Sequence, residues 1–131
     1  SMKSFLWNNS EIDTAAMRIA DGSGMSRYNL VSANQIVDVL TLMSNHPNKD
    51  YFLNSFPTGG EKESTLENRL QNTNGKIHAK TGSMSGVSSL SGYAFSPKYG
   101  PLAFSILING YVGSSFPYHQ LQDGICEWLV K

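Results

Sequence analysis

The sequence predicts an α+β fold: an antiparallel sheet of three or more strands, flanked by helices. The first observation is a change of periodicity near residue 76, where helical spacing of apolar residues gives way to strand-like runs. The second is that short turns rich in serine, glycine and proline separate these runs, as expected of antiparallel neighbours. The third is a final helix-like stretch that can cover one face of such a sheet.

The first third of the chain carries helical signals around a polar loop. Residues 3–9 resemble the last turns of a helix, and residues 17–20 form a brief extended run before a glycine-rich loop. Ser32 is a typical N-cap for a helix over 33–43, where apolar residues recur every three or four positions. We expect that apolar stripe to face the core.

Two shorter helices are predicted in the middle of the chain. Pro47 ends the preceding helix, and a short helix is expected around residues 50–55. Ser64 stands three residues before Glu67, which is the spacing of a capping box, and predicts a helix that continues to Gln71. The helical segment 32–71 is expected toward the cleft side, and the final helix on one face of the sheet.

Three strand-like runs follow, and they predict a meander. The runs cover 77–81, 87–95 and 102–111. The third is almost continuously apolar, which favours a central strand covered on both faces. A final helix is expected over 118–130, with a sheet-facing stripe consisting of Leu121, Ile125, Trp128 and Leu129.

Composition excludes several classes of function. The 131 residues fit one domain or a piece of a larger one, and ten basic against ten acidic side chains indicate no nucleic-acid partner. The three histidines are scattered, so no metal site is expected, and no glycine pattern matches a nucleotide or cofactor motif. No apolar run is long enough for a transmembrane segment. Cys126 is alone, and its apolar neighbours predict a buried structural thiol.

The most informative stretch begins at the strand over 77–81, which ends in Lys80, Thr81 and Gly82. Lysine offers a compact charge for a carboxylate, threonine offers a hydroxyl, and glycine lets a ligand backbone approach. A polar hairpin tip is the alternative explanation for an isolated tripeptide. The same three residues are also the third element of the penicillin-recognising set, whose first element is Ser-x-x-Lys.

An upstream loop supplies the residue types of the second element of that set. The loop reads DGSGMSRYNLVS and contains Ser26 and Asn29, although two residues separate them where the usual motif has one. No serine in the chain is followed by lysine three residues later. A Ser-x-x-Lys nucleophile is therefore absent from these residues.

Three segments carry a resemblance to a known family. Residues 20–32, the TLENRL run at 65–70 and residues 76–93 resemble the C-terminal part of the D-alanyl-D-alanine carboxypeptidase/endopeptidases, the low-molecular-mass class C penicillin-binding proteins. The resemblance implies a β-lactamase/transpeptidase-like fold. It also implies that residues 1–131 form the C-terminal portion of this domain, with the nucleophile in a preceding portion, and that the protein works in the periplasm or elsewhere outside the cytoplasm.

The resemblance implies a role for each candidate residue. Ser26 would relay a proton to the leaving amine and Asn29 would bind the substrate amide. Lys80 and Thr81 would bind the terminal carboxylate, beside Gly82, and a backbone N–H near Ser83 would form part of an oxyanion hole. The partners implied are peptidoglycan stem peptides ending in D-Ala-D-Ala and, in the full-length enzyme, β-lactams. No cofactor is implied.

Alternatives remain open at this point. The chain could be a noncatalytic module that binds peptidoglycan or a partner through the same cleft, or an interaction domain whose motif match is accidental. As an enzyme fragment without its nucleophile, it is expected to be inactive alone. Uncovered sheet edges and apolar faces also predict self-association of the isolated chain.

Overall fold

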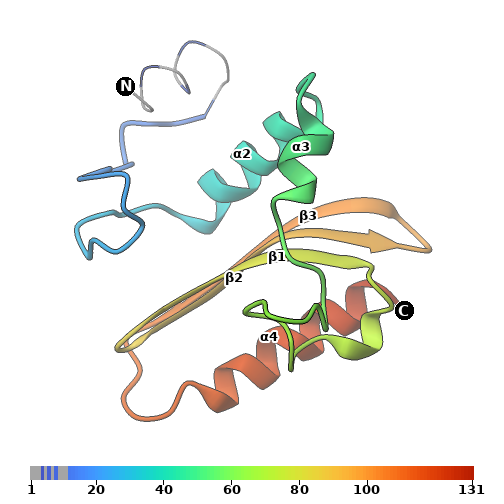
Figure 1. Cartoon of the computed structure of the whole chain (residues 1–131). Helices are drawn as coiled ribbons and strands as arrows, with labels where there is room; N and C mark the ends of the chain where they lie inside the picture. Colours follow the sequence, from blue (N-terminus) through green and yellow to red (C-terminus); the bar gives the residue numbers. More distant parts are fainter. Residues whose placement is uncertain (1–3, 5, 7, 9–11) are drawn as a thin grey trace.

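The computed structural model describes Ser4, Leu6, Asn8 and residues 12–131. These residues form three layers, with α2 and α3 on one face of a sheet and α4 on the other (Figure 1). In chain order the elements are α2 (Ala33–Ser44), α3 (Lys49–Asn54), the 3-10 helix η1 (Gln71–Thr73), β1 (Ile77–Met84), β2 (Val87–Ser96), β3 (Gly100–Asn109) and α4 (Phe116–Leu129). The predicted α+β class is confirmed.

The sheet is an antiparallel meander in the order β1-β2-β3. Met84 pairs with Val87 at the first hairpin, where Gly86 adopts φ +74°, a conformation that side chains disfavour. The prediction that the third run is the central strand is wrong: β2 is central, and β3 lies at one edge of the sheet in the described part of the chain. Its apolar pattern has another cause, because β3 packs between α2 on one face and the core on the other.

The predicted start of α2 is confirmed. The Ser32 hydroxyl accepts a hydrogen bond from the Gln35 N–H at 3.2 Å, and the Gln35 side chain accepts one from the Ser32 N–H at 2.9 Å. This reciprocal pair is a capping box. Gln35 is buried, and its amide nitrogen donates to the carbonyl oxygen of Asp13 at 2.7 Å, so the cap also fastens the N-terminal segment to α2.

The helix predicted from Ser64 to Gln71 does not form. The Ser64 hydroxyl donates to the carbonyl oxygen of Glu61 at 2.7 Å, and the segment is a series of turns that ends in η1. Leu70 has φ +58°, which interrupts any helix at that point. The turns wrap around Gly60, whose N–H lies 3.0 Å from the Leu66 carbonyl oxygen and 2.9 Å from that of Arg69.

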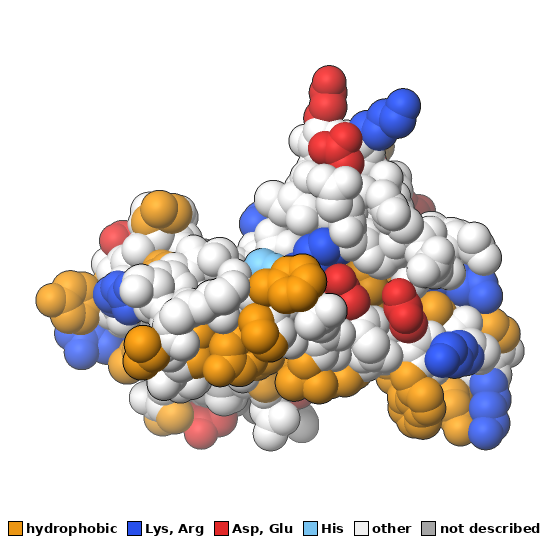
Figure 2. All heavy atoms as spheres, turned by 90° about the horizontal axis from the view of Figure 1, so that it is seen from below, with side chains coloured by type: hydrophobic (Ala, Val, Ile, Leu, Met, Phe, Trp, Pro, Cys, Tyr) orange, Lys and Arg blue, Asp and Glu red, His pale blue; other side chains and the backbone are white. Residues whose placement is uncertain are grey.

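The face of α4 that covers the sheet also differs from the prediction. Gln122 and Cys126 are fully buried, whereas Leu121 and Trp128 of the predicted stripe are 54% and 69% exposed. A buried glutamine is tolerated here because both ends of its amide are hydrogen-bonded. Leu121, Ile125 and Trp128 therefore face outward, whereas Leu129 packs against the core. Figure 2 shows hydrophobic side chains gathered on this side of the molecule.

Two hydrophobic clusters hold the layers together. The larger one lies between the sheet, α4 and the turns before η1, and contains Leu66, Leu70, Ile77, Ala79, Leu90, Ala94, Phe104, Cys126 and Val130. The smaller one joins the N-terminal segment to α2 through Leu6, Ile12 and Met17. Ser4, Leu6 and Asn8 are helical, as predicted for 3–9, and the other residues of that segment lie outside the described residues.

Candidate functional site

In β1, the N–H and C=O groups of the odd-numbered residues point away from β2. The N–H of Phe95, next to β2's end, donates to the Lys76 carbonyl oxygen at 2.8 Å, so even-numbered groups face β2. On the other side, the N–H of Ala79 donates to the Pro57 carbonyl oxygen at 3.0 Å. Because the direction of peptide groups alternates along a strand, Thr81 and Ser83 also direct their N–H and C=O groups away from β2.

The outer edge of β1 is only half covered. Residues 57–59 pair with its first part, where the Gly59 N–H donates to the Ile77 carbonyl oxygen at 3.1 Å. Beyond Ala79, no backbone group of the described residues pairs with the outer N–H of Thr81 or of Ser83. An unpaired strand edge of this kind can add an extended peptide as a further strand.

Lys80 places a charge beside this free edge. Its side chain is exposed, and its ammonium group donates to the carbonyl oxygen of Thr81 at 2.7 Å. An ammonium group has three N–H donors, so two remain for a ligand. Lys80 also borders a mostly apolar hollow of about 290 Å³ between the sheet and the helices α2 and α3, lined among others by Leu40 and Phe56.

Gly82 lies opposite Ser89 of β2. A Cβ atom at position 82 would collide with the Ser89 hydroxyl oxygen, and no backbone atom comes as close. A side chain at this position would therefore require the Ser89 hydroxyl to rotate away. The glycine avoids this contact next to Lys80, in addition to the predicted close approach of a ligand backbone.

Asn29 organises the loop that contains Ser26. Its side-chain oxygen accepts from the N–H of Ala20 at 2.7 Å and of Asp21 at 3.3 Å, and its nitrogen donates to the Asp21 carbonyl oxygen. The loop is closed at its base by two hydrogen bonds between Arg18 and Leu30. Most donors and acceptors of the Asn29 side-chain amide, which is predicted to bind substrate, are therefore used within the loop. One N–H of this amide remains for another partner.

Arg27 joins this loop to the tip of β1. Its guanidinium donates to the carbonyl oxygen of Ser85 at 3.0 Å, 58 residues away in sequence. The neighbouring Ser26 is half-buried, and its hydroxyl accepts from the Tyr28 N–H at 3.2 Å. No hydrogen bond within the described chain links Ser26 or Asn29 to residues 80–83. The structure thus connects the Ser26 loop to the turn after β1 through Arg27, which lies between Ser26 and Asn29 in the sequence.

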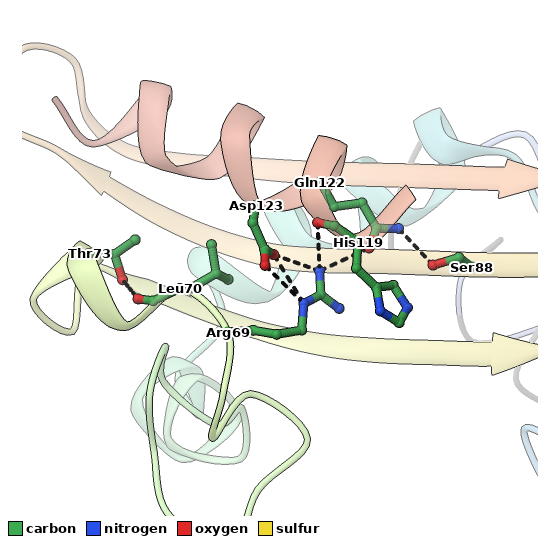
Figure 3. Close-up of polar contacts among 7 residues, drawn as sticks. All are labelled: Arg69, Leu70, Thr73, Ser88, His119, Gln122 and Asp123. Atoms are coloured by element: carbon green, nitrogen blue, oxygen red, sulfur yellow. Dashed lines mark hydrogen bonds and ion pairs between the residues drawn. The ribbon is translucent and has the colours of Figure 1, made fainter. Parts of the chain in front are cut away.

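A polar network behind β1 holds the turns that precede it (Figure 3). The Arg69 guanidinium forms an ion pair with Asp123 of α4 at 2.6 Å and donates to the Gln122 side-chain oxygen at 3.0 Å. The Gln122 amide nitrogen then reaches the Ser88 hydroxyl at 3.2 Å. Ser88 is the cross-strand partner of Ser83, so this network ends directly behind the candidate oxyanion residue.

This network shows that the TLENRL run at 65–70 connects the turns before β1 to α4. The spacing of residues in the sequence did not reveal this role. The arginine of this run, Arg69, forms hydrogen bonds to side chains of α4, and its leucines Leu66 and Leu70 enter the main cluster. The capping-box spacing of Ser64 and Glu67 directed the sequence interpretation toward a helix instead.

Two titratable side chains in or near β1, His78 and Cys126, have pKa values shifted by burial. Burial lowers the pKa of His78, and this effect exceeds the opposing influence of the Glu61 carboxylate. The His78 ring packs edge-on against Phe95 at 5.4 Å. Burial raises the pKa of the Cys126 thiol to about 12, so this cysteine is a poor nucleophile near neutral pH. This agrees with its predicted structural role.

Neither a metal cluster nor a spanning helix is found in the part of the chain that the structure describes. No three or more histidine, cysteine, aspartate or glutamate side chains there come close enough to hold a metal ion. None of the helices among those residues combines the length and apolar character needed to cross a bilayer.

The helices on both faces of this sheet, with a lysine-bearing edge strand, define the fold of the penicillin-binding proteins. A solved structure supports this fold assignment: the penicillin binding protein 4 (dacB) of Haemophilus influenzae, crystallised with a β-lactam. It matches with a TM-score of 0.85 at 29% identity, and the match covers 98% of this chain and 32% of that one. A predatory endopeptidase of Bdellovibrio bacteriovorus, in complex with an immunity protein, shares the fold with a TM-score of 0.79 at 22% identity, over 98% of this chain and 36% of that one.

The chain belongs to the D-Ala-D-Ala carboxypeptidase 3 (S13) family, whose model matches residues 1–131. It is 46% identical, over 92% of its length, to the D-alanyl-D-alanine carboxypeptidase of Actinomadura sp. strain R39, and covers 23% of that protein. It is 33% identical to the carboxypeptidase DacB of Haemophilus influenzae, over 71% of this chain and 20% of that protein. The predicted family is confirmed, and the chain spans about a quarter or less of these relatives.

Proposed function

We propose that this chain forms the substrate-binding wall of a serine-type D-Ala-D-Ala peptidase that acts on peptidoglycan stem peptides. The observation that carries the proposal is the free edge of β1, where the outward N–H groups of Thr81 and Ser83 stand next to the Lys80 ammonium group. A stem peptide would add to this edge as an extended strand. Because peptidoglycan lies outside the cytoplasm, the proposed site works there.

The terminal carboxylate of the peptide is the group that Lys80 suits best. Two free N–H donors on Lys80 and the Thr81 hydroxyl would hold the carboxylate by charge-assisted hydrogen bonds. The outward N–H of Ser83 would donate to the carbonyl oxygen of the scissile bond as negative charge develops on it. Ser26 is proposed to pass a proton to the leaving D-alanine amine, and the remaining N–H of Asn29 to bind the substrate amide.

The proposed reaction needs a serine from a part of the protein outside these residues. That serine would attack the penultimate carbonyl carbon, the C–N bond would break, and the proton from the serine would reach the departing amine. Water would then hydrolyse the acyl-serine ester. A β-lactam would acylate the same serine. No Ser-x-x-Lys sequence occurs in the chain, so we propose that the 131 residues alone are inactive.

Peptide titration of the chain tests the binding role. We expect a peptide ending in D-Ala-D-Ala to shift the NMR amide signals of Thr81 and Ser83, and Lys80→Ala to weaken binding about tenfold or more, because a charge-assisted hydrogen bond is lost. Lys98→Ala, which removes a charge from the turn between β2 and β3, is the matched control and should bind as the wild type does. Unchanged binding by Lys80→Ala would reject the proposed carboxylate site.

Penicillin labelling tests the catalytic part separately. A fluorescent penicillin should leave no stoichiometric, denaturation-resistant adduct on the 131-residue chain. A noncatalytic binding module would give the same result, so the comparison must include the full-length protein, where we expect an adduct. An adduct on the chain alone would contradict the assignment of the nucleophile to another part of the protein.

A further inference from the structure

Residues 57–59, here called the edge segment, occupy the same edge of β1 that a substrate would use. The segment runs antiparallel to β1, with Thr58 opposite His78. Hydrogen bonds from Ala79 N–H to Pro57 and from Gly59 N–H to Ile77 complete the pairing. Only the part of the edge beyond Ala79 is left for a ligand, because two strands cannot pair with the same peptide groups.

An antiparallel peptide on the free edge would meet the edge segment with its C-terminal end. Such a peptide runs from the side of Ser83 toward Thr81, and the next outward-facing position, Ala79, is already bonded to Pro57. Lys80 lies between these two positions and supplies the cation for a carboxylate. The residue before the segment, Phe56, packs edge-on against Tyr93 of β2 at 5.9 Å.

Several contacts keep the edge segment in place. A Cβ atom on Gly59 would lie 2.5 Å from the Leu70 carbonyl oxygen and 2.7 Å from the Thr73 hydroxyl, so this glycine sits directly against the turn behind it. The Glu61 carboxylate accepts from the Thr58 N–H at 2.7 Å. The turn itself is fastened to α4 by Arg69 (Figure 3).

We propose that the edge segment is an end stop, which restricts the free edge of β1 to peptides whose chain terminates in a carboxylate beside Lys80. This inference rests on the proposed function of the edge as a substrate site, and adds the reason for selecting a chain end. A peptide extended by one residue would have to displace residues 57–59 or leave its carboxylate away from Lys80. Charge and chain length are therefore separate requirements.

Three peptides separate these requirements. The first ends in free D-Ala-D-Ala, the second carries one further C-terminal glycine, and the third is the C-terminal amide of the first. NMR titration of the 131-residue chain, followed at Thr81 and Ser83, gives each dissociation constant. We expect both altered peptides to bind about tenfold or more weakly, the amide through loss of charge and the extended peptide through the end stop.

A glycine variant tests the end stop itself. Gly59→Ala adds one methyl group against Leu70 and Thr73, and should displace the edge segment. We expect the preference for the free terminus over the extended peptide to fall to about threefold or less, while the preference over the amide persists. Gly124→Ala, where an added Cβ meets nothing within 4 Å, is the matched control and should keep both preferences.

A second variant guards against misfolding of the first. Glu61→Gln removes the charge that holds the Thr58 N–H without adding bulk, and hydrogen exchange at the Ala79 N–H reports whether the segment has moved. Faster exchange without a change in preference would overturn the end stop, as would equal binding of the free and extended peptides by the wild type. If no peptide shifts Thr81 or Ser83, the substrate site fails and the end stop fails with it.

Discussion

The Arg69 guanidinium contacts the Asp123 carboxylate at 2.6 Å, although the two residues are 54 positions apart in sequence. The pair connects the turns before β1 to α4, and the same turns support residues 57–59 on the edge of β1. The geometry of the β1 edge therefore depends on the packing of the last helix. Loss of this ion pair should lower the stability of the fold. It should also lengthen the part of the β1 edge that residues 57–59 leave uncovered.

Arg69→Ala should lower the free energy of unfolding by about 2 kcal/mol. The side chains of the pair are 14% and 21% exposed, so the loss should be smaller than the roughly 3–5 kcal/mol typical of breaking a fully buried pair. Urea denaturation measures the change, and exchange at the Ala79 N–H should become faster. Lys62→Ala, on an exposed turn, is the control, and a loss below about 0.5 kcal/mol would show that the pair contributes little.

Tyr93→Phe should destabilise the contact between the sheet and α2. The Tyr93 hydroxyl donates to the Leu40 carbonyl oxygen at 2.6 Å in a buried position. Removing the donor takes away the side-chain partner of that oxygen, which lies within α2, at a cost of about 1 kcal/mol in denaturant titration. Tyr51→Phe changes a residue that is 83% exposed and should have almost no effect. Equal losses in the two variants would argue against the buried hydrogen bond.

Stability should fall as the pH drops from about 7 to 5, partly because of His78. Burial lowers the pKa of His78 in the folded chain below its ordinary value of about 6.5, so the unfolded chain binds more protons near that pH. The contribution is therefore fully present above about pH 6.5 and is lost as the pH falls toward the folded-state pKa. His119 also has a pKa lowered first by burial and then by Arg69, and acts in the same direction.

His78→Phe should reduce this dependence, because it removes the titrating group and keeps an aromatic ring against Phe95. Urea denaturation at several pH values measures the slope. Between about pH 8 and 9, where both histidines are neutral, wild type and variant should show parallel curves. A variant slope as steep as the wild-type slope between pH 7 and 5 would exclude His78 as a contributor.

Trp128→Lys should reduce self-association of the isolated chain. Leu121 and Trp128 of α4 are 54% and 69% exposed. Exposed apolar side chains of this kind favour association, and a charge among them opposes it. Light scattering over a concentration series should show a lower mean mass for the variant. Tyr51→Lys, an aromatic replacement outside α4, is the control, and a wild type that stays monomeric would contradict the expectation.

Local signals in the sequence were sufficient for most elements. Ser32 and Gln35 specify the start of α2 because their reciprocal hydrogen bonds involve residues three positions apart. The start of β1 and the extent of β2 followed from short-range alternation, but β1 continues to Met84, beyond its predicted end at residue 81. Family membership also came from contiguous segments, since residues 20–32 and 76–93 each carry their motif without any knowledge of long-range contacts.

The corrections share one physical cause, which is that the partner of each residue was distant in the chain. Ser64 and Glu67 had the spacing of a helix cap, but their segment wraps around Gly60 and is held on α4 by Arg69. The predicted sheet-facing stripe of the last helix did not include Gln122, yet its partners Ser88 and Arg69 allow it to be buried. The pattern of apolar residues in the sequence could not reveal that these hydrogen bonds compensate for the burial of Gln122.

Both the local sequence and the tertiary structure determine the free edge of β1 beside Lys80. The sequence by itself determined the strand, its Lys-Thr-Gly end and the family, because these depend on residue type and short spacing. Only the tertiary structure decided which peptide groups of β1 face outward, that residues 57–59 cover the first half of its edge, and that Arg27 brings the Ser26 loop to its tip. Pairing across strands and between distant loops is set by packing of the whole chain, so no local pattern encodes it.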